Sequence, residues 1–506
     1  MVAIITSGFL SVFTFKIMGL ILAGVVLGII FGAIPGITVT MGVALFLPIT
    51  FGMQPIDGLA LLMGLYIGGT SGGLISAILL KIPGTPASIA TTFDGHPMAA
   101  RGEAGKALGV GIVYSFLGGM FSLVILMILS PALANIALQF GSYEYFSIAI
   151  FSLTMISGLS SGSMIKGFVS ALIGVTFAFV GIAPITGFPR FTFGFSQLNA
   201  GFDLLPALIG LFAVSQIFIF AEEKKGVEQD AAIADYKIKG FGFTMTEFKS
   251  QLGNFFRSSL IGTGIGILPG LGGGICNIIA YGTAKKRSKH PEKFGTGIID
   301  GIVASETSNN ASTGGALVPL MTLGIPGDNT TAIILAGFMI HGITPGPLLF
   351  STSGELVYGI FGALIIANVF MLIAEFVGMR VFVKLLSVPK HILLPMVIAF
   401  CAIGSFGINN RVFDVWTMLA FGVLGYLMKK LKFPEAPVIL GFILGPIVET
   451  NLRRGLMKSQ GSFTPFITEP ISALFLVITA VVVTMNIVSA VKKARTRKMD
   501  TITVSQ

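Results

Sequence analysis

Charged residues are scarce in this chain: only 11% of its 506 residues are Asp, Glu, Lys or Arg, while 54% are hydrophobic. Soluble domains carry about 25% charged residues, so this chain lacks the charge needed to cover a globular surface in water. Its two cysteines, Cys276 and Cys401, both lie in apolar runs and are expected to be small core residues. These shortages exclude a soluble enzyme, a nucleic-acid module, a disordered scaffold and a disulfide-stapled secreted domain.

Long apolar runs are what the chain has in abundance, with a mean hydropathy of +0.91 and 66 glycines. A transmembrane helix needs about 20 apolar residues. Runs of this kind lie at 15–34, 37–52, 56–80, 107–137, 145–160, 164–186, 202–221, 257–282, 298–323, 330–350, 354–378, 391–408, 412–428, 436–448 and 466–491. Several runs are short or interrupted by Gly and Pro, so the sequence predicts an all-α polytopic membrane protein with about 10–13 transmembrane segments.

Basic residues divide the chain. The net charge of +10 is typical of Lys and Arg collected in cytoplasmic loops, and needs no nucleic-acid partner. We therefore predict a first transmembrane repeat at 1–221, a polar cytoplasmic linker at 222–256, a second repeat with C-terminal spans at 257–491, and a basic cytoplasmic tail at 492–506. A further basic run at 285–289 lies on the same side only if 257–282 is a hairpin that enters and leaves on one face.

Three short patterns recur in the same order in both halves. A Gly-x-x-Pro-Gly pattern occurs at 32–36 and 266–270, a cluster of small residues at 70–73 and 313–315, and an Ile-Pro-Gly pattern at 82–84 and 325–327. One such match is expected by chance in a glycine-rich chain, but three in register indicate an internal repeat. We predict two inverted repeats with broken or re-entrant helices.

Polar clusters inside the apolar runs mark the candidate site. Transporters built from paired repeats bind their cargo where helices break, because freed N–H groups attract carboxylates and freed carbonyls bind Na⁺. The predicted substrate-binding residues are Thr70, Ser71, Gly72, Thr85, Asn309, Asn310, Thr313, Asp328 and Asn329. The predicted cation-binding residues are Pro35, Gly36, Ser71, Pro269, Gly270, Ser308 and Asn309. The competing explanation is helix packing by small residues.

Other charged residues in or near the spans have two explanations each. Glu375 and Asp414 are candidate proton-relay groups, but each lies near the end of a run and could reach water. Residues 94–97 are either a gate or partner contact, or an ordinary turn. His341 at a span end is expected to be structural. The second cluster also contains Glu306, whose orientation the sequence leaves open.

The sequence lacks the nucleotide-binding motifs that ATP-driven transport would require. No Walker A pattern occurs, since the nearest candidate, at 105–107, lacks the preceding glycine and the hydroxyl residue. The glycines at 270–274 do not match a dinucleotide-binding pattern, and nothing predicts a strand–turn–helix unit around them. We expect an ion gradient, with Na⁺ or H⁺ as the coupling ion and no bound cofactor.

The sequence resembles the large membrane subunit of the tripartite tricarboxylate transporters, the TctA family, through nearly its whole length. The matching segments are GAIPG at 32–36, ILLKIPGTPASIATTFDGHP at 78–97, GFPRFTFG at 187–194, GILPGLGG at 266–273, NNASTGGALVPLMTLGIPG at 309–327, HGITPGPLLF at 341–350 and GFILGPIVETNLRRG at 441–455. The resemblance implies a multi-pass bacterial inner-membrane importer of citrate or related organic anions by Na⁺ or H⁺ symport. It also implies a small TctB-like membrane subunit and a TctC-like periplasmic binding protein as partners.

The chain departs from the family pattern at three places. Residues 305–308 read Ser-Glu-Thr-Ser in place of Pro-Glu-Ala-Ala, residues 327–329 read Gly-Asp-Asn in place of Gly-Ser, and Ala183-Pro184 stands where Asp-Pro is usual. Asp328 would repel a tricarboxylate, so it either ligates the cation, or faces a loop, or indicates a less charged substrate. A cation antiporter or an ion channel using the same broken helices is the alternative function, while a membrane enzyme lacks a catalytic constellation.

Overall fold

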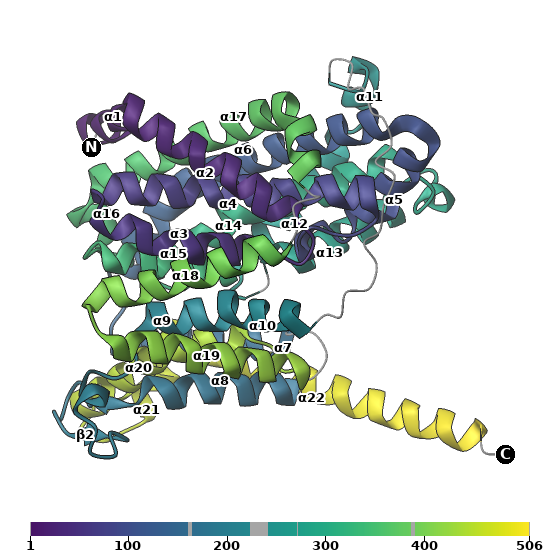
Figure 1. Cartoon of the computed structure of the whole chain (residues 1–506). Helices are drawn as coiled ribbons and strands as arrows, with labels where there is room; N and C mark the ends of the chain where they lie inside the picture. The colour runs from purple at the N-terminus through teal and green to yellow at the C-terminus, as the bar shows by residue number, and fades with distance from the viewer. Residues whose placement is uncertain (1, 160–163, 223–240, 271, 386–389, 505–506) are drawn as a thin grey trace. The chain divides into compact units, whose positions relative to one another are not determined.

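A computed structural model of the chain describes residues 2–159, 164–222, 241–270, 272–385 and 390–504 (Figure 1). Helices dominate these residues, which contain one strand pair, β1 (Gly181–Ile182) antiparallel to β2 (Pro189–Arg190). Seven described helices are long and apolar enough to cross a membrane: Phe15–Ala33, Pro55–Leu80, Thr91–Ala137, Leu204–Glu222, Gly354–Met379, Val412–Lys430 and Ala436–Lys458. The predicted all-α polytopic membrane fold is confirmed, while the number of 10–13 segments stays a prediction.

The chain forms two compact units, each contributed by two stretches of sequence. The first consists of Met1–Leu138 and Asp203–Leu427, and the second of Gln139–Phe202 and Met428–Gln506. These units are groups of packed helices and do not test the sequence repeats at 1–221 and 257–491. Most of the linker predicted at 222–256 and the side chains of the predicted tail at 492–506 lie outside what the structure describes.

The first unit holds all the predicted site residues. From its first stretch come α1 (Val2–Ser11), α2 (Phe15–Ala33), α3 (Val39–Phe46), η1 (Leu47–Gly52), α4 (Pro55–Leu80), η2 (Pro86–Ser88), α5 (Thr91–Met98), η3 (Ala99–Glu103) and α6 (Ala104–Ala137). The second stretch supplies α9 (Leu204–Ile209), η5 (Gly210–Val214), α10 (Ser215–Glu222), α11 (Met245–Ser250), α12 (Leu252–Ile267), α13 (Gly272–Arg287), η6 (Pro291–Lys293), α14 (Ile299–Leu323), α15 (Asn329–Ile340), α16 (Leu349–Thr352), α17 (Gly354–Leu385), α18 (Lys390–Asn409) and α19 (Val412–Lys430), whose last residues enter the second unit.

The second unit is a smaller helical group. It contains α7 (Ser142–Leu159), α8 (Met164–Ala178), β1, β2, η4 (Ser196–Ala200), α20 (Ala436–Lys458), α21 (Thr464–Thr468) and α22 (Pro470–Val504). The helices α7, α8 and α20 pack against one another, and α22 packs on α7. An ion-pair network joins Arg190 and Arg453 to Glu449 within this unit.

The Pro-Gly patterns break helices where the sequence predicts breaks. Helix α2 ends before Ile34 and α12 ends before Leu268, both of which have extended backbone. Gly36 (φ 88°) and Gly270 (φ 79°) then take the left-handed conformation that glycine adopts without strain. Helices α12 and α13 have 16 residues each and pack against each other. At about 1.5 Å per residue each is shorter than the bilayer core, as a re-entrant hairpin requires.

The Ile-Pro-Gly patterns follow matching helix ends. Helix α4 is terminated by Lys81 and α14 by Gly324, both left-handed, with φ of 59° and 71°. Four residues further on, the Thr85 N–H donates to Ser88 Oγ and the Asp328 N–H donates to Thr331 Oγ1. These correspondences support the predicted repeat, and its inverted orientation stays a prediction.

The polar clusters themselves do not break helices, contrary to the expectation. Helix α4 runs without interruption through 68–73, and α14 through 305–315. The small residues there let helices touch backbone to backbone: a Cβ on Gly72 would lie 2.5 Å from the Ile29 carbonyl oxygen, and one on Gly315 would lie 2.4 Å from that of Thr263. Small-residue packing therefore accounts for these glycines, Gly72 included.

Residues 94–97, expected to form a turn or a gate, lie in α5, and Asp94 is fully buried. Asp94 Oδ1 accepts hydrogen bonds from the N–H groups of Gly295 (2.9 Å), Gly297 (2.8 Å) and Ile298 (3.1 Å), and Oδ2 accepts one from the Tyr281 hydroxyl (2.9 Å). One carboxylate thus fixes the loop that precedes α14.

We expect Asp94→Ala to destabilise the protein by about 3 kcal/mol or more, because four donors, one of them the buried Tyr281 hydroxyl, lose their acceptor. Tyr281→Phe removes only one of these bonds and should cost about 1 kcal/mol. Thermal unfolding of the purified proteins in detergent measures both. Equal losses in the two variants would contradict the clamp role of Asp94.

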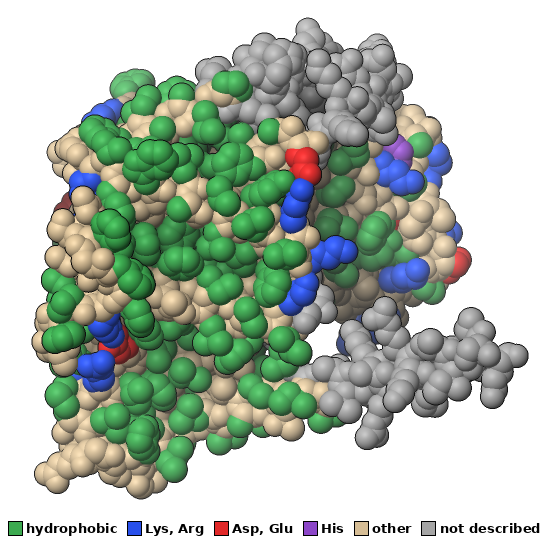
Figure 2. Space-filling view, turned by 60° about the horizontal axis from the view of Figure 1, so that its bottom comes forward, with side chains coloured by type: hydrophobic (Ala, Val, Ile, Leu, Met, Phe, Trp, Pro, Cys, Tyr) green, Lys and Arg blue, Asp and Glu red, His purple; other side chains and the backbone are tan. Residues whose placement is uncertain are grey.

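Figure 2 shows a face on which hydrophobic side chains predominate and charged groups are few. Large apolar side chains are exposed along the membrane-crossing helices, for example Ile128 (68%), Val377 (81%) and Trp416 (65%). Soluble monomers rarely expose such extensive apolar surface. These helices are therefore built to face lipid.

Candidate functional site

Asn309 of α14 has one satisfied and one unsatisfied side-chain atom. The residue is fully buried, and its Nδ2 donates to the Thr70 carbonyl oxygen of α4 at 3.1 Å. Its Oδ1 is buried without a hydrogen-bond partner. A Cβ on Gly273 would lie 2.7 Å from this Oδ1 and 2.9 Å from Ala87 Cβ. The glycine at the start of α13 thus lets three segments approach one another around an open acceptor.

Two more buried oxygens without partners lie on the adjoining segments. Asn277 of α13 donates through Nδ2 to the carbonyl oxygens of Pro86 (3.3 Å) and Ala87, while its Oδ1 has no partner. Thr85 Oγ1, at the start of the same 85–88 segment, also has none. We call Thr85, Asn277 and Asn309 the acceptor cluster. Leaving a buried acceptor unpaired costs about 1–3 kcal/mol, so three on adjoining segments indicate a binding site.

Both carboxylate oxygens of Asp328 accept hydrogen bonds from neighbouring residues. It precedes α15 as its N-cap, where Oδ1 accepts from the Thr331 N–H at 2.7 Å and Oδ2 accepts from the Tyr66 hydroxyl at 2.7 Å. A carboxylate is favourable at a helix N-terminus. The negative charge therefore already occupies the start of α15. Asp328 also lies against Gly272, since a Cβ there would be 3.1 Å from Asp328 Cβ.

Helix α13 begins differently, with three glycines in a row. Its first residues are Gly272, Gly273 and Gly274, which carry no side chains, and the four N–H groups at a helix start have no partner within the helix. The preceding hairpin tip is tied to the Ile-Pro-Gly loop of the same half by the Gly270 N–H, which donates to the Gly327 carbonyl oxygen at 2.7 Å. A helix N-terminus beside open acceptors offers complementary sites for an anion and a cation.

The other predicted site residues have different environments. Within α14, Ser308 donates to the Ala304 carbonyl oxygen, Asn310 to that of Glu306, and Thr313 to that of Asn310. Pro269 is buried at the hairpin tip, Asn329 is half-buried at the start of α15, and Pro35 is half-buried at the first break. Gly36 is exposed and faces the Phe220 ring.

Ser71 does not join the acceptor cluster. It lies inside α4, and its hydroxyl donates to Glu375 Oε2 of α17 at 3.0 Å. We therefore leave Ser71 out of the cation set. Glu375 itself is fully buried, so the expectation that it reaches water is wrong. Tertiary packing is the reason, because α17 continues ten residues past Glu375 and packs on five other helices.

Asp414 and His341 each lie at a helix end and have a structural explanation. Asp414 is buried at the start of α19 and pairs with Arg411 at 2.9 Å, so an ion pair explains its burial better than contact with water does. His341 is the C-cap residue of α15 and lies against Gly58 of α4.

The sequence did not predict two residues of the site, Asn277 and Tyr66. The signal for Asn277 was one amide within an apolar stretch at 275–280.

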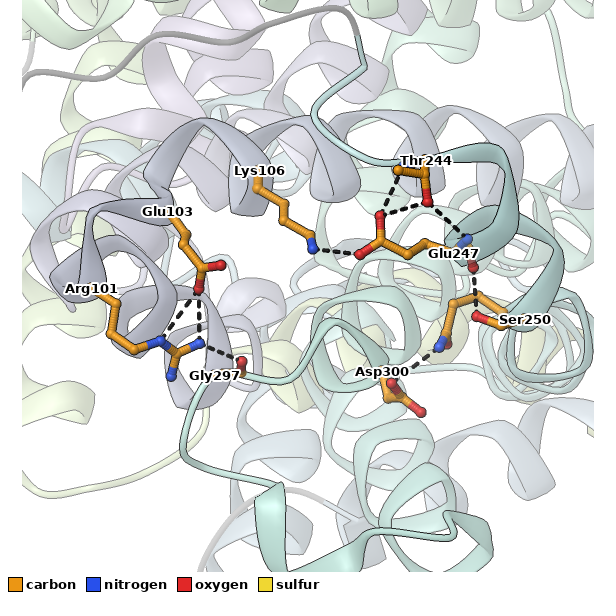
Figure 3. Close-up of polar contacts among 9 residues, drawn as sticks. Arg101, Glu103, Lys106, Thr244, Glu247, Ser250, Gly297 and Asp300 are labelled. Atoms are coloured by element: carbon orange, nitrogen blue, oxygen red, sulfur yellow. Dashed lines mark hydrogen bonds and ion pairs between the residues drawn. The ribbon is translucent and has the colours of Figure 1, made fainter.

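Polar contacts also join the described end of the predicted linker to α6 (Figure 3). Lys106 pairs with Glu247 of α11, and this hydrogen bond lowers the pKa of the Glu247 carboxyl. Arg101 donates to the carbonyl oxygens of Thr296 and Gly297 and pairs with Glu103 at 3.0 Å. These contacts are partly exposed and fasten α11 and the loop before α14 to the helices that follow α5.

Comparison with known proteins identifies the family. The family model described as "Tripartite tricarboxylate transporter TctA family" matches residues 18–440. A relative from Agrobacterium vitis, "Uncharacterized 52.8 kDa protein in TAR-I ttuC' 3'region", is 35% identical over 472 residues, which is 93% of each chain. A second from the same organism, "Uncharacterized protein in TAR-II ttuC' 3'region", is 36% identical over 234 residues, 46% of this chain and 97% of the relative. No solved structure matches. The chain belongs to the tripartite tricarboxylate transporter TctA family.

Proposed function

We propose that this chain is the large permease subunit of a tripartite secondary transporter, which imports an organic anion across the bacterial inner membrane together with a cation. The observation that carries the proposal is the acceptor cluster of Thr85, Asn277 and Asn309 beside the three glycines that begin α13. The two features have opposite preferences, since oxygen acceptors bind cations and a helix N-terminus binds carboxylates. A symporter needs both cargoes in one place.

The anion is assigned to the start of α13. The N–H groups of Gly273 and Gly274 would bind one carboxylate, and these glycines let a ligand come close to the backbone. Asp328 caps α15 and also lies against Gly272 at the start of α13, so each further carboxylate of the substrate would meet like charge. This arrangement favours a mono- or dicarboxylate over citrate, although tricarboxylates are the family default.

The cation is assigned to the acceptor cluster. Na⁺ is a hard cation and prefers neutral oxygen ligands of the kind that Asn and Thr side chains supply, along with free backbone carbonyls. This set keeps Asn309 and moves Thr85 from the predicted substrate set to the cation set. It adds Asn277, while Ser71 and Ser308 bond within or between helices instead.

Family membership supports the partner assignment. Transporters of this family are tripartite, so we propose a small TctB-like membrane subunit and a TctC-like periplasmic binding protein that delivers the anion. The proposed location is the inner membrane, with the basic segments in the cytoplasm.

Uptake into vesicles tests the function. Vesicles containing this chain and the small subunit receive the binding protein outside and a panel of labelled mono-, di- and tricarboxylates, citrate included. We expect saturable accumulation that needs the binding protein and collapses when the Na⁺ and pH gradients are both removed. Flux that does not saturate would favour an ion channel, and cation exchange without carboxylate uptake would favour an antiporter.

A further inference from the structure

Glu375 is a buried carboxyl group outside the acceptor cluster. It lies in α17, which packs against α1, α2, α4, α6 and α16, and it is 0% exposed. Its Oε2 accepts the Ser71 hydroxyl at 3.0 Å, whereas its Oε1 is buried without a hydrogen-bond partner. An ionised carboxylate needs donors at both oxygens when no water surrounds it.

No described basic side chain pairs with Glu375. On the helices packed against α17, Lys16 pairs with Asp57, and Lys106 pairs with Glu247 of α11. The tyrosines of these helices are also occupied, since Tyr66 donates to Asp328 and Tyr114 to the Phe248 carbonyl oxygen. Helix α1 carries no charged residue.

The neighbouring acid Glu306 provides a contrast. It is equally buried, on α14, but both of its oxygens accept hydroxyl groups: Oε1 from Thr91 and Oε2 from Ser115 (3.0 Å). Two buried negative charges without a cation are costly at membrane depth. Glu306 has donors at both oxygens, whereas Glu375 has a donor at only one, so the proton is assigned to Glu375.

We propose that Glu375 binds a proton in this state and releases it during the transport cycle, so that H⁺ helps to drive import from a site separate from the acceptor cluster. The proton enters from water outside and forms the O–H bond of the carboxyl group. It leaves to water on the inner side, which restores the carboxylate. This inference rests on the proposed import function.

Helix α4 connects Glu375 to the acceptor cluster. Ser71, which bonds Glu375, directly follows Thr70, whose carbonyl oxygen accepts Asn309 Nδ2. Loss of the proton gives Glu375 a negative charge and strengthens the hydrogen bond that it accepts from Ser71. A shift of α4 toward α17 would be felt at Asn309, which gives the proton a physical route to the transported ions.

The test uses the full chain with its small subunit in vesicles and the carboxylate panel with binding protein outside. With the membrane potential clamped, one unit of inward pH gradient supports about tenfold accumulation for each proton carried. We expect Glu375→Gln to lose this accumulation and to retain exchange of labelled for unlabelled carboxylate, which needs no net proton movement. Gln keeps the Ser71 bond and is neutral, so the variant should fold.

A matched control and a substrate-free measurement complete the design. Glu355→Gln, which changes an exposed carboxyl group at the start of the same helix α17, should keep the accumulation driven by the pH gradient. Infrared difference spectra of the purified protein, recorded as the pH is raised from acidic to alkaline, should show loss of a protonated carboxyl band that is absent in Glu375→Gln. Wild-type behaviour of Glu375→Gln, or wild-type accumulation that ignores the pH gradient, would overturn the proton site. Absence of both uptake and exchange in the wild type would instead overturn the import function.

Discussion

Asn309→Ala will lower kcat/KM for carboxylate uptake by about 10- to 100-fold, while the amount of protein in the membrane stays near the wild-type level. The expectation follows from its open Oδ1, which the proposal assigns to the cation, and from its bond to Thr70 on α4. Losing one buried polar contact costs about 1–3 kcal/mol, which corresponds to this range. Initial uptake rates at several cation concentrations measure the change.

The dependence on cation concentration separates binding from structure. If Asn309 binds the cation, Asn309→Ala should raise the cation concentration needed for half-maximal uptake more than it lowers the maximal rate. Asn451→Ala is the control, because that amide also bonds a helix carbonyl, that of Ile447, but lies in the second unit. Unchanged cation dependence in Asn309→Ala would remove Asn309 from the site.

Gly84→Ala will destabilise the protein more than its single added methyl group suggests. A Cβ at Gly84 would lie 2.1 Å from the Gly32 carbonyl oxygen and 2.9 Å from Gly73 Cα, and both are backbone atoms that cannot rotate away. Overpacking costs about 1–3 kcal/mol, and rigid neighbours favour the upper end of this range. The loop that carries Gly84 would have to move away from α2 and α4, and Thr85 would move with it.

Thermal unfolding in detergent and the uptake rate measure this effect together. Gly253→Ala is the matched control, because nothing lies within 4 Å of its added Cβ in α12, and alanine favours a helix by about 1 kcal/mol over glycine. We expect Gly253→Ala to be neutral or slightly stabilising and to transport normally. Equal stability of the two variants would contradict the close crossing at Gly84.

The helix breaks were predictable because their causes are local. Proline lacks an N–H and glycine adopts positive φ, so the Pro-Gly pairs at 35–36 and 269–270 end helices wherever they occur. The same reasoning failed for the clusters at 68–73 and 305–315. Small and polar residues suit both a helix break and a close helix crossing, and only the neighbouring helix decides between the two.

The amino-acid sequence by itself determined the membrane environment, the helical class, the two Pro-Gly breaks and the family, because these follow from composition, local backbone preference and long matching segments. The tertiary structure alone decided which oxygens stay unpaired. Thr85, Asn277 and Asn309 lie on adjoining segments because η2, α13 and α14 pack together, and Glu375 is buried where α17 packs on α4. Burial and missing partners depend on neighbours distant in sequence, and they are what turns polar residues into candidate binding sites.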